Sequence, residues 1–179
     1  MRRDVPPFSL FAVGYLCLAL NLNINGFELL LPNLVGYFLI CAASWSQRDR
    51  GMLYLAAAIG AVLLIPFGFR DFFYYAYRES FPDFDWLKLL QLPLATLLAL
   101  LVAGMVWREA GASRRPMLAA MAFATLPILA ASHYANGQMP RSSNDEKVVA
   151  IFVQVIPDFY LALLTWLAQR WLGNSRSID

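Results

Sequence analysis

Long apolar runs follow one another along this chain, and they constrain its fold more than any other feature. They lie at residues 8–24, 29–46, 52–69, 86–107, 116–133 and 148–172. A helix needs ~20 apolar residues to cross the hydrocarbon layer of a bilayer, which is about 30 Å thick. The chain is 60% hydrophobic and 15% charged, and a soluble domain of 179 residues cannot bury so much apolar surface. The sequence predicts an all-α polytopic membrane protein, with one transmembrane domain of six spans over residues 1–179.

The basic residues predict how these spans are oriented. If the spans alternate in direction, nine basic residues lie on one side: Arg2, Arg3, Arg48, Arg50, Arg108, Arg114, Arg115, Arg170 and Arg176. Five lie on the other: Arg70, Arg78, Lys88, Arg141 and Lys147. Loops rich in arginine and lysine stay in the cytoplasm. We therefore expect both termini in the cytoplasm and, since arginine dominates as in GC-rich bacterial genomes, a location in the inner membrane of a bacterium.

Several classes of function find no support in the sequence. The formal charge of +2 is too small to indicate nucleic acid as a partner. Cys17 and Cys41 both fall inside apolar runs, so they form neither a disulfide framework nor a CxxC motif. No nucleophile elbow, phosphate-binding glycine loop or zinc motif is present. We expect no metal and no cofactor, and the sequence does not favour an enzyme.

One proline that follows an aliphatic residue stands in each of the last five runs. They are Pro32, Pro66, Pro93, Pro127 and Pro157. With the orientation above, all five lie in the outer half of the membrane, where a proline frees a carbonyl one turn earlier and bends a helix. The pattern predicts proline-interrupted spans that splay around an outward-facing polar pocket. The alternative is inherited helix geometry without a pocket.

Asp158 is the costliest residue of the chain to place in a membrane. It lies about 15 Å along a helix that begins at Val148, at 1.5 Å per residue. A charged acid at that depth costs ~2.5–3.5 kcal/mol on insertion scales, so it faces protein or water and has a partner. Gln154, one turn earlier, is a candidate partner. One interpretation is a proton- or cation-responsive site, and the other is a structural hydrogen bond between spans.

Three further residues are candidates for the same pocket. Glu28 and Asn33 flank the leucine run before Pro32, and His133, the only histidine, ends the fifth span. Histidine with acids can form a metal or acid–base site. The spacing of these residues matches no such motif, so a histidine without a special role is the alternative.

An aromatic segment follows the third run. On a helical wheel Phe69, Phe72, Phe73 and Tyr77 share one face, and charged residues share the opposite face. This pattern predicts an amphipathic helix over 69–80 lying in the outer interface of the membrane. A lid over the pocket and a surface for a partner are the alternatives.

A short hairpin carries a resemblance. Asn23–Gly26 leads to Leu30-Leu31-Pro32-Asn33-Leu34-Val35-Gly36-Tyr37. This run resembles one in uncharacterised small bacterial multipass membrane proteins, which ends in Leu-Pro-(Asn or Asp)-aromatic-Ile-Gly-Tyr. Here Leu34 replaces the aromatic residue and Val35 the isoleucine. The resemblance spans residues 23–37 and implies a fold neighbourhood, without an activity or a functional residue.

The same hairpin begins an internal similarity. Leu31–Leu34 resembles Ile156–Phe159, and each is followed by an apolar run that ends in tryptophan, glutamine and arginine, at 45–48 and 166–170. This similarity suggests a parallel repeat that pairs the first two spans with the last two.

Taken together, these patterns favour a small transporter or permease-like binding protein in the lipid bilayer. Asp158, Gln154, Asn33, Glu28 and His133 would line its pocket, and its substrate would be a small molecule or ion. One alternative is a non-catalytic subunit or scaffold of an envelope complex, with a membrane-protein partner or a second copy of the chain. Another is an outer-face lipid-modifying enzyme that uses His133.

Overall fold

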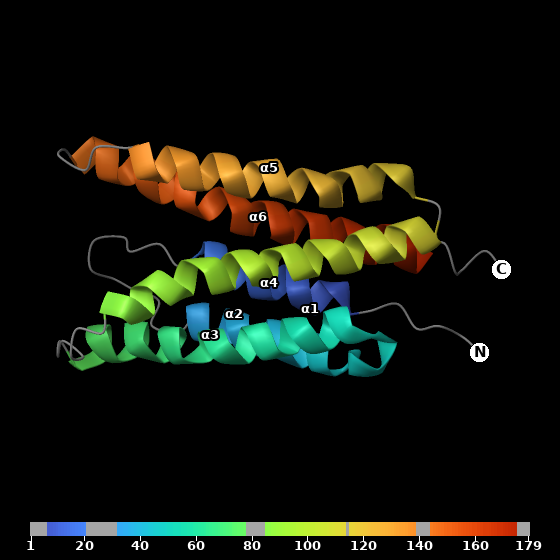
Figure 1. The fold of residues 1–179 in the computed structure, drawn as a ribbon, viewed down its shortest axis with the longest axis horizontal. Coiled ribbons are helices and arrows are strands. Elements are labelled where there is room, and N and C mark those ends of the chain that lie inside the picture. The colour runs from blue at the N-terminus through green and yellow to red at the C-terminus, as the bar shows by residue number, and fades with distance from the viewer. Residues whose placement is uncertain (1–6, 21–31, 78–84, 114, 139–143, 175–179) are drawn as a thin grey trace.

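The computed structural model describes residues 7–20, 32–77, 85–113, 115–138 and 144–174, and within them the chain is helical with no strand. Figure 1 shows the helices running side by side along one axis. They are α1 (Phe8–Ala19), α2 (Pro32–Trp45), α3 (Met52–Tyr77), α4 (Asp85–Ala112), α5 (Pro116–Gln138) and α6 (Asn144–Asn174), with a short 3-10 helix, η1 (Arg48–Arg50), between α2 and α3. The all-α fold expected from the sequence is confirmed.

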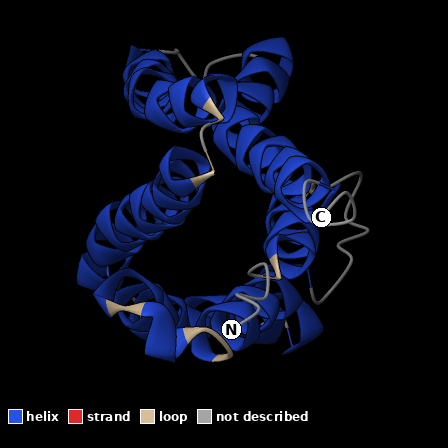
Figure 2. Cartoon of the chain, turned by 90° about the vertical axis from the view of Figure 1, so that its right-hand side faces the viewer, coloured by secondary structure: helices blue, strands red, loops and turns tan. Residues whose placement is uncertain are grey.

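The six helices form a closed ring in chain order. Each helix packs against the next, and α6 packs against α1, as the view along the helices shows (Figure 2). We call the end where α1 begins and α6 finishes the terminal end, and the opposite end the far end. The tight connections at the terminal end, η1 with Gly51 and residues 113–115, make α2–α3 and α4–α5 antiparallel neighbours.

The helix α1 approaches α2 very closely, and glycine permits it. A Cβ atom on Gly36 would lie 2.8 Å from the carbonyl oxygen of Gly14, and a Cβ on Gly14 would lie 3.0 Å from that of Gly36. Gly68 of α3 lies as close to the backbone of Leu34. Small residues let helix backbones meet where no hydrophobic effect drives association.

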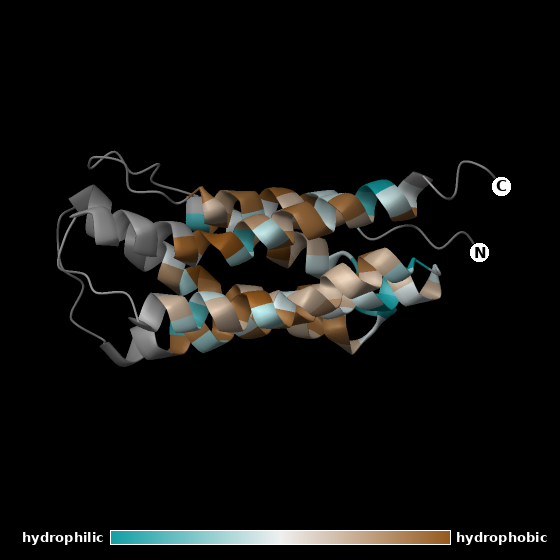
Figure 3. Cartoon of the chain, turned by 90° about the horizontal axis from the view of Figure 1, so that it is seen from above, coloured by the Kyte–Doolittle hydropathy of each residue, from teal (hydrophilic) through white to brown (hydrophobic). Residues whose placement is uncertain are grey.

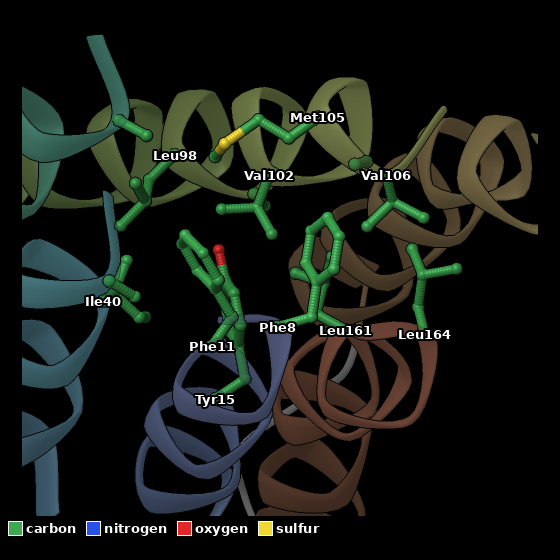
Figure 4. Close-up of a cluster of buried hydrophobic side chains, with 14 of the residues drawn as sticks. Phe8, Phe11, Tyr15, Ile40, Leu98, Val102, Met105, Val106, Leu161 and Leu164 are labelled. Atoms are coloured by element: carbon green, nitrogen blue, oxygen red, sulfur yellow. The ribbon is translucent and has the colours of Figure 1, made fainter. Parts of the chain in front are cut away.

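One buried apolar core joins the helices along the ring. At the terminal end, Phe8 and Phe11 of α1 meet Leu161 and Leu164 of α6 and Val106 of α4 (Figure 4). All five side chains are fully buried. The same cluster continues toward the far end through residues such as Phe67 of α3 and Leu129 of α5.

The helices differ from the expected spans in two ways. Continuous helix runs through Pro66, Pro93, Pro127 and Pro157, so the prolines do not interrupt the spans. Residues 69–77 are also the end of α3, because the helix that starts at Met52 continues to Tyr77. The prediction of a separate interfacial helix over 69–80 is therefore wrong for residues 69–77, and residues 78–80 lie outside the described part. The side chains of Phe69, Phe72, Phe73 and Tyr77 lie outside the described part, as do residues 21–31.

Candidate functional site

The residue Asp158 stands near the middle of α6 and is partly buried. The hydroxyl of Tyr15, from α1, lies within electrostatic range of the Asp158 carboxyl and of Tyr37 of α2. Tyr15 and Tyr37 are themselves buried, 2% and 6% exposed. Tyr15 of α1 is therefore the residue that links this acid of α6 with a phenol of α2.

The hydroxyl group of Tyr15 is unsatisfied. It is buried and finds no hydrogen-bond partner among the described residues. Figure 4 shows the Tyr15 side chain pointing from α1 into the ring. A buried hydroxyl without a partner costs about 1–3 kcal/mol. The buried hydroxyls of Ser44 and Thr125 share this condition, and Tyr15 has in addition a carboxyl nearby.

Asn33 belongs to the same region through its helix position. It lies one turn before Tyr37, and residues four apart share one face of a helix. Asn33 is partly buried and has a polar interaction of its own. Of the residues predicted to line the pocket, Asn33 and Asp158 are therefore placed toward one cluster.

A hydrogen bond between α5 and α6 explains how α6 tolerates Pro157. Proline has no N–H, so the carbonyl of Val153, four residues earlier, loses its helical donor. The Ser132 hydroxyl of α5 donates to that carbonyl over 2.8 Å. A side chain of the neighbouring helix thereby satisfies the backbone about one turn from Asp158.

His133 pairs with a threonine. Its Nε2 lies 2.9 Å from Thr96 Oγ1 of α4, and the Thr96 hydroxyl donates to the carbonyl of Leu92 over 2.8 Å. The Thr96 hydroxyl has one hydrogen, which it donates either to Leu92 or to His133, so the direction of the bond depends on the histidine tautomer. This bond links α5 to α4, and among the described residues no acidic side chain bonds to His133.

For the two remaining candidates, Glu28 and Gln154, the structure describes no side chain. Glu28 lies outside the described residues, and so does the side chain of Gln154, although its backbone belongs to α6. Within the described part, no group of three His, Cys, Asp or Glu residues is placed to hold a metal ion.

Sequence reasoning missed Tyr15, Tyr37, Ser132 and Thr96. Tyrosine and hydroxyl residues inside apolar runs are the signal that points to them, because each must find a polar partner in the interior. That signal does not reveal the partner, since Tyr15 meets Asp158 only through the closure of α1 on α6.

The outward faces of the helices are apolar. Two described helical stretches, Leu90–Ala112 and Pro116–Ala135, are long and apolar enough to cross a membrane. In the most apolar part of each stretch, only 33% of the first and 28% of the second is buried, so most of this part faces outward. Figure 3 shows hydrophobic residues along the described helices, and strongly hydrophilic ones near the end where α6 finishes.

No protein-family model, no curated protein and no solved structure matches this chain. The fold and the cluster around Asp158 therefore carry the functional argument.

Proposed function

We propose that this chain is a six-span integral membrane protein that binds a small cationic solute or a proton between α1, α2 and α6, and carries it across the inner membrane of a bacterium. The observation that carries the binding site is the buried Tyr15 hydroxyl, which has no hydrogen-bond partner among the described residues and lies within electrostatic range of Asp158. A transporter needs such a polar group inside the bundle, where a solute can complete its hydrogen bonds.

The exposed faces of the helices support the membrane placement. Large apolar residues lie exposed on every helix, for example Val13, Phe38, Ile59, Leu97, Phe123 and Leu163. A soluble bundle covers its outward faces with polar residues. Alanines are frequent among the buried residues, beside large ones such as Phe8, Phe11 and Leu161. Apolar outward faces and close packing through small residues suit helices that are surrounded by lipid.

The helix lengths fit a bilayer. At 1.5 Å per residue, the 26 residues of α3, 28 of α4, 23 of α5 and 31 of α6 each extend beyond the roughly 30 Å of hydrocarbon. Within residues 148–165, which α6 includes, Asp158 is the only charged residue. We place α1 and α2 as the remaining two spans.

We infer that a solute enters from the far end. Phe11 precedes Tyr15 by one turn of α1, and Leu161 follows Asp158 by about one turn of α6. Both are fully buried, on the side of Tyr15 and Asp158 that lies toward the terminal end. The far end faces outward if both termini are cytoplasmic.

Membrane insertion is tested by extraction. The expressed chain stays in the pellet when membranes are washed with alkaline carbonate and is released by a mild detergent. Release by carbonate alone contradicts the six-span placement, whatever the solute.

Transport is tested in proteoliposomes. We expect methylammonium or tetraethylammonium to enter faster than into empty vesicles under an imposed pH gradient, and Asp158→Asn to abolish the difference. The matched control is Asp49→Asn, which removes an exposed acid on η1. Uptake that Asp158→Asn leaves unchanged, or wild-type uptake of both probes no faster than in empty vesicles, contradicts the proposal.

A further inference from the structure

Arginines gather at the terminal end. Arg48 and Arg50 belong to η1, Arg108 to the last turns of α4, Arg115 precedes α5, and Arg170 lies near the end of α6. None of the five forms an ion pair within the part of the chain that the structure describes. The described acids at this end are Asp49 and Glu109.

Glu109 bonds to Tyr54. The Tyr54 hydroxyl, fully buried at the start of α3, donates to Glu109 Oε1 over 3.2 Å. This bond fixes the carboxylate against the α3–α4 contact, and no ion pair joins it to Arg50 or Arg108 in the described part of the chain.

Two of the arginines meet at one place. Arg50 and Arg108 both lie within electrostatic range of the Tyr54 hydroxyl. Arg108 Nη1 lies 3.0 Å from the point that a Cβ of Gly51 would occupy, so its guanidinium lies directly over the Gly51 backbone. Gly51 has a φ of 138°, which favours glycine, and the missing side chain leaves room for Arg108. Arg108 thus lies over the turn between η1 and α3, and Arg50 is the residue that precedes this glycine.

Tryptophans surround this positive end. Trp45, Trp107 and Trp166 are 53%, 60% and 47% exposed. The guanidinium carbon of Arg48 lies 5.0 Å from the ring centroid of Trp45, and that of Arg170 lies 5.5 Å from Trp166. Exposed tryptophans beside basic residues are typical of the boundary between hydrocarbon and headgroups. The arginines therefore stand at the depth of lipid phosphates.

We propose that the terminal end binds the phosphate of anionic phospholipids, with Arg50 and Arg108 as the paired ligands over Gly51. This inference rests on the proposed membrane placement and adds a lipid site that the transport proposal does not need. Guanidinium groups bind phosphate oxygens through two parallel N–H donors, and two of them over one backbone turn match a single headgroup. The source is a lipid, since the tryptophans hold the arginines at the membrane surface.

The test is thermal unfolding of the full chain in a neutral detergent, with dioleoyl phosphatidylglycerol added. A ligand that binds only the folded state raises Tm as its concentration rises. We expect phosphatidylglycerol to raise Tm, and phosphatidylcholine and inorganic phosphate to leave it unchanged. In the double variant Arg50→Gln with Arg108→Gln, the same rise in Tm requires about tenfold more phosphatidylglycerol or beyond, because basic residues near an anionic surface attract it strongly.

The matched control is Arg115→Gln, which removes an exposed arginine outside this pair and leaves the response intact. If the double variant does not fold, Arg108→Lys serves instead, because lysine keeps the charge and loses the two-pronged geometry. It then weakens the response while Arg115→Gln does not.

Three results overturn the inference. The first is an equal rise in Tm with phosphatidylglycerol in the double variant and the wild type. The second is a rise in the wild-type Tm with phosphatidylcholine that equals the rise with phosphatidylglycerol. The third is an equal rise with inorganic phosphate, which would indicate a free anion as the ligand. Failure of the transport proposal shows separately, as wild-type uptake no faster than in empty vesicles made of neutral lipid.

Discussion

At the scale of single residues, Tyr15 is the most informative position. Its phenol is enclosed by the core and points into the ring, and its hydroxyl has no hydrogen-bond partner among the described residues. A phenylalanine there would pack the same ring without that cost. Stability therefore does not explain the hydroxyl, and the proposed solute would give it a partner.

Tyr15→Phe separates these two roles. We expect the variant to be as stable as the wild type or more stable by about 1 kcal/mol, because an unsatisfied buried hydroxyl is removed. We expect its uptake of the cationic probe to fall. Unfolding followed by circular dichroism in detergent, alongside the liposome assay, measures both. A loss of stability with unchanged uptake would show that the hydroxyl is structural.

At the scale of helices, a hydroxyl of α5 compensates for the proline of α6. Ser132→Ala removes the donor to the Val153 carbonyl, and we expect a loss of about 1 kcal/mol. Pro157→Ala restores the N–H that bonds this carbonyl within the helix. In that background, Ser132→Ala costs much less. A double-mutant cycle of unfolding free energies measures the difference. Equal costs in both backgrounds would contradict the compensation.

The contact of α1 with α2 gives a second prediction at this scale. Gly36→Ala places a methyl group 2.8 Å from the carbonyl oxygen of Gly14, so the helices must separate. We expect a loss of about 1–3 kcal/mol, as for other overpacked cores. The control is Gly104→Ala in α4, where a Cβ meets nothing within 4 Å. There alanine gains up to about 1 kcal/mol of helix propensity. Similar effects of the two substitutions would contradict the close approach.

The same helices show what the sequence alone predicts. The apolar runs located each of the six helices, because hydrophobic length is a local property. The prediction that the prolines interrupt the helices was wrong, because a neighbouring helix can supply the hydrogen-bond donor that a proline lacks. The donor from Ser132 to Val153 lies 21 residues away in the chain. The separate helix expected over 69–80 was wrong for a related reason. An amphipathic pattern does not show where a helix begins, and α3 continues through residues 69–77.

At the scale of the whole molecule, the ring explains why the site was only half predicted. Asp158 stands out in any reading of the sequence, as a lone acid in an apolar run. Its neighbour Tyr15 lies at the opposite end of the chain, and only the packing of α6 on α1 brings the two together. His133 and Asn33 stood out equally in the sequence. Asn33 lies one turn from Tyr37 on α2, whereas His133 bonds to Thr96 in the α4–α5 contact.

The entry of a solute to Asp158 from the far end is tested by cysteine labelling. In a chain with Cys17→Ala and Cys41→Ala, Asp158→Cys is exposed to a membrane-impermeant methanethiosulfonate reagent in right-side-out and inverted vesicles. We predict reaction in right-side-out vesicles only, and no reaction in either orientation for Leu161→Cys in the buried core. Reaction of Asp158→Cys in inverted vesicles, or in neither orientation, would rule out entry from the far end.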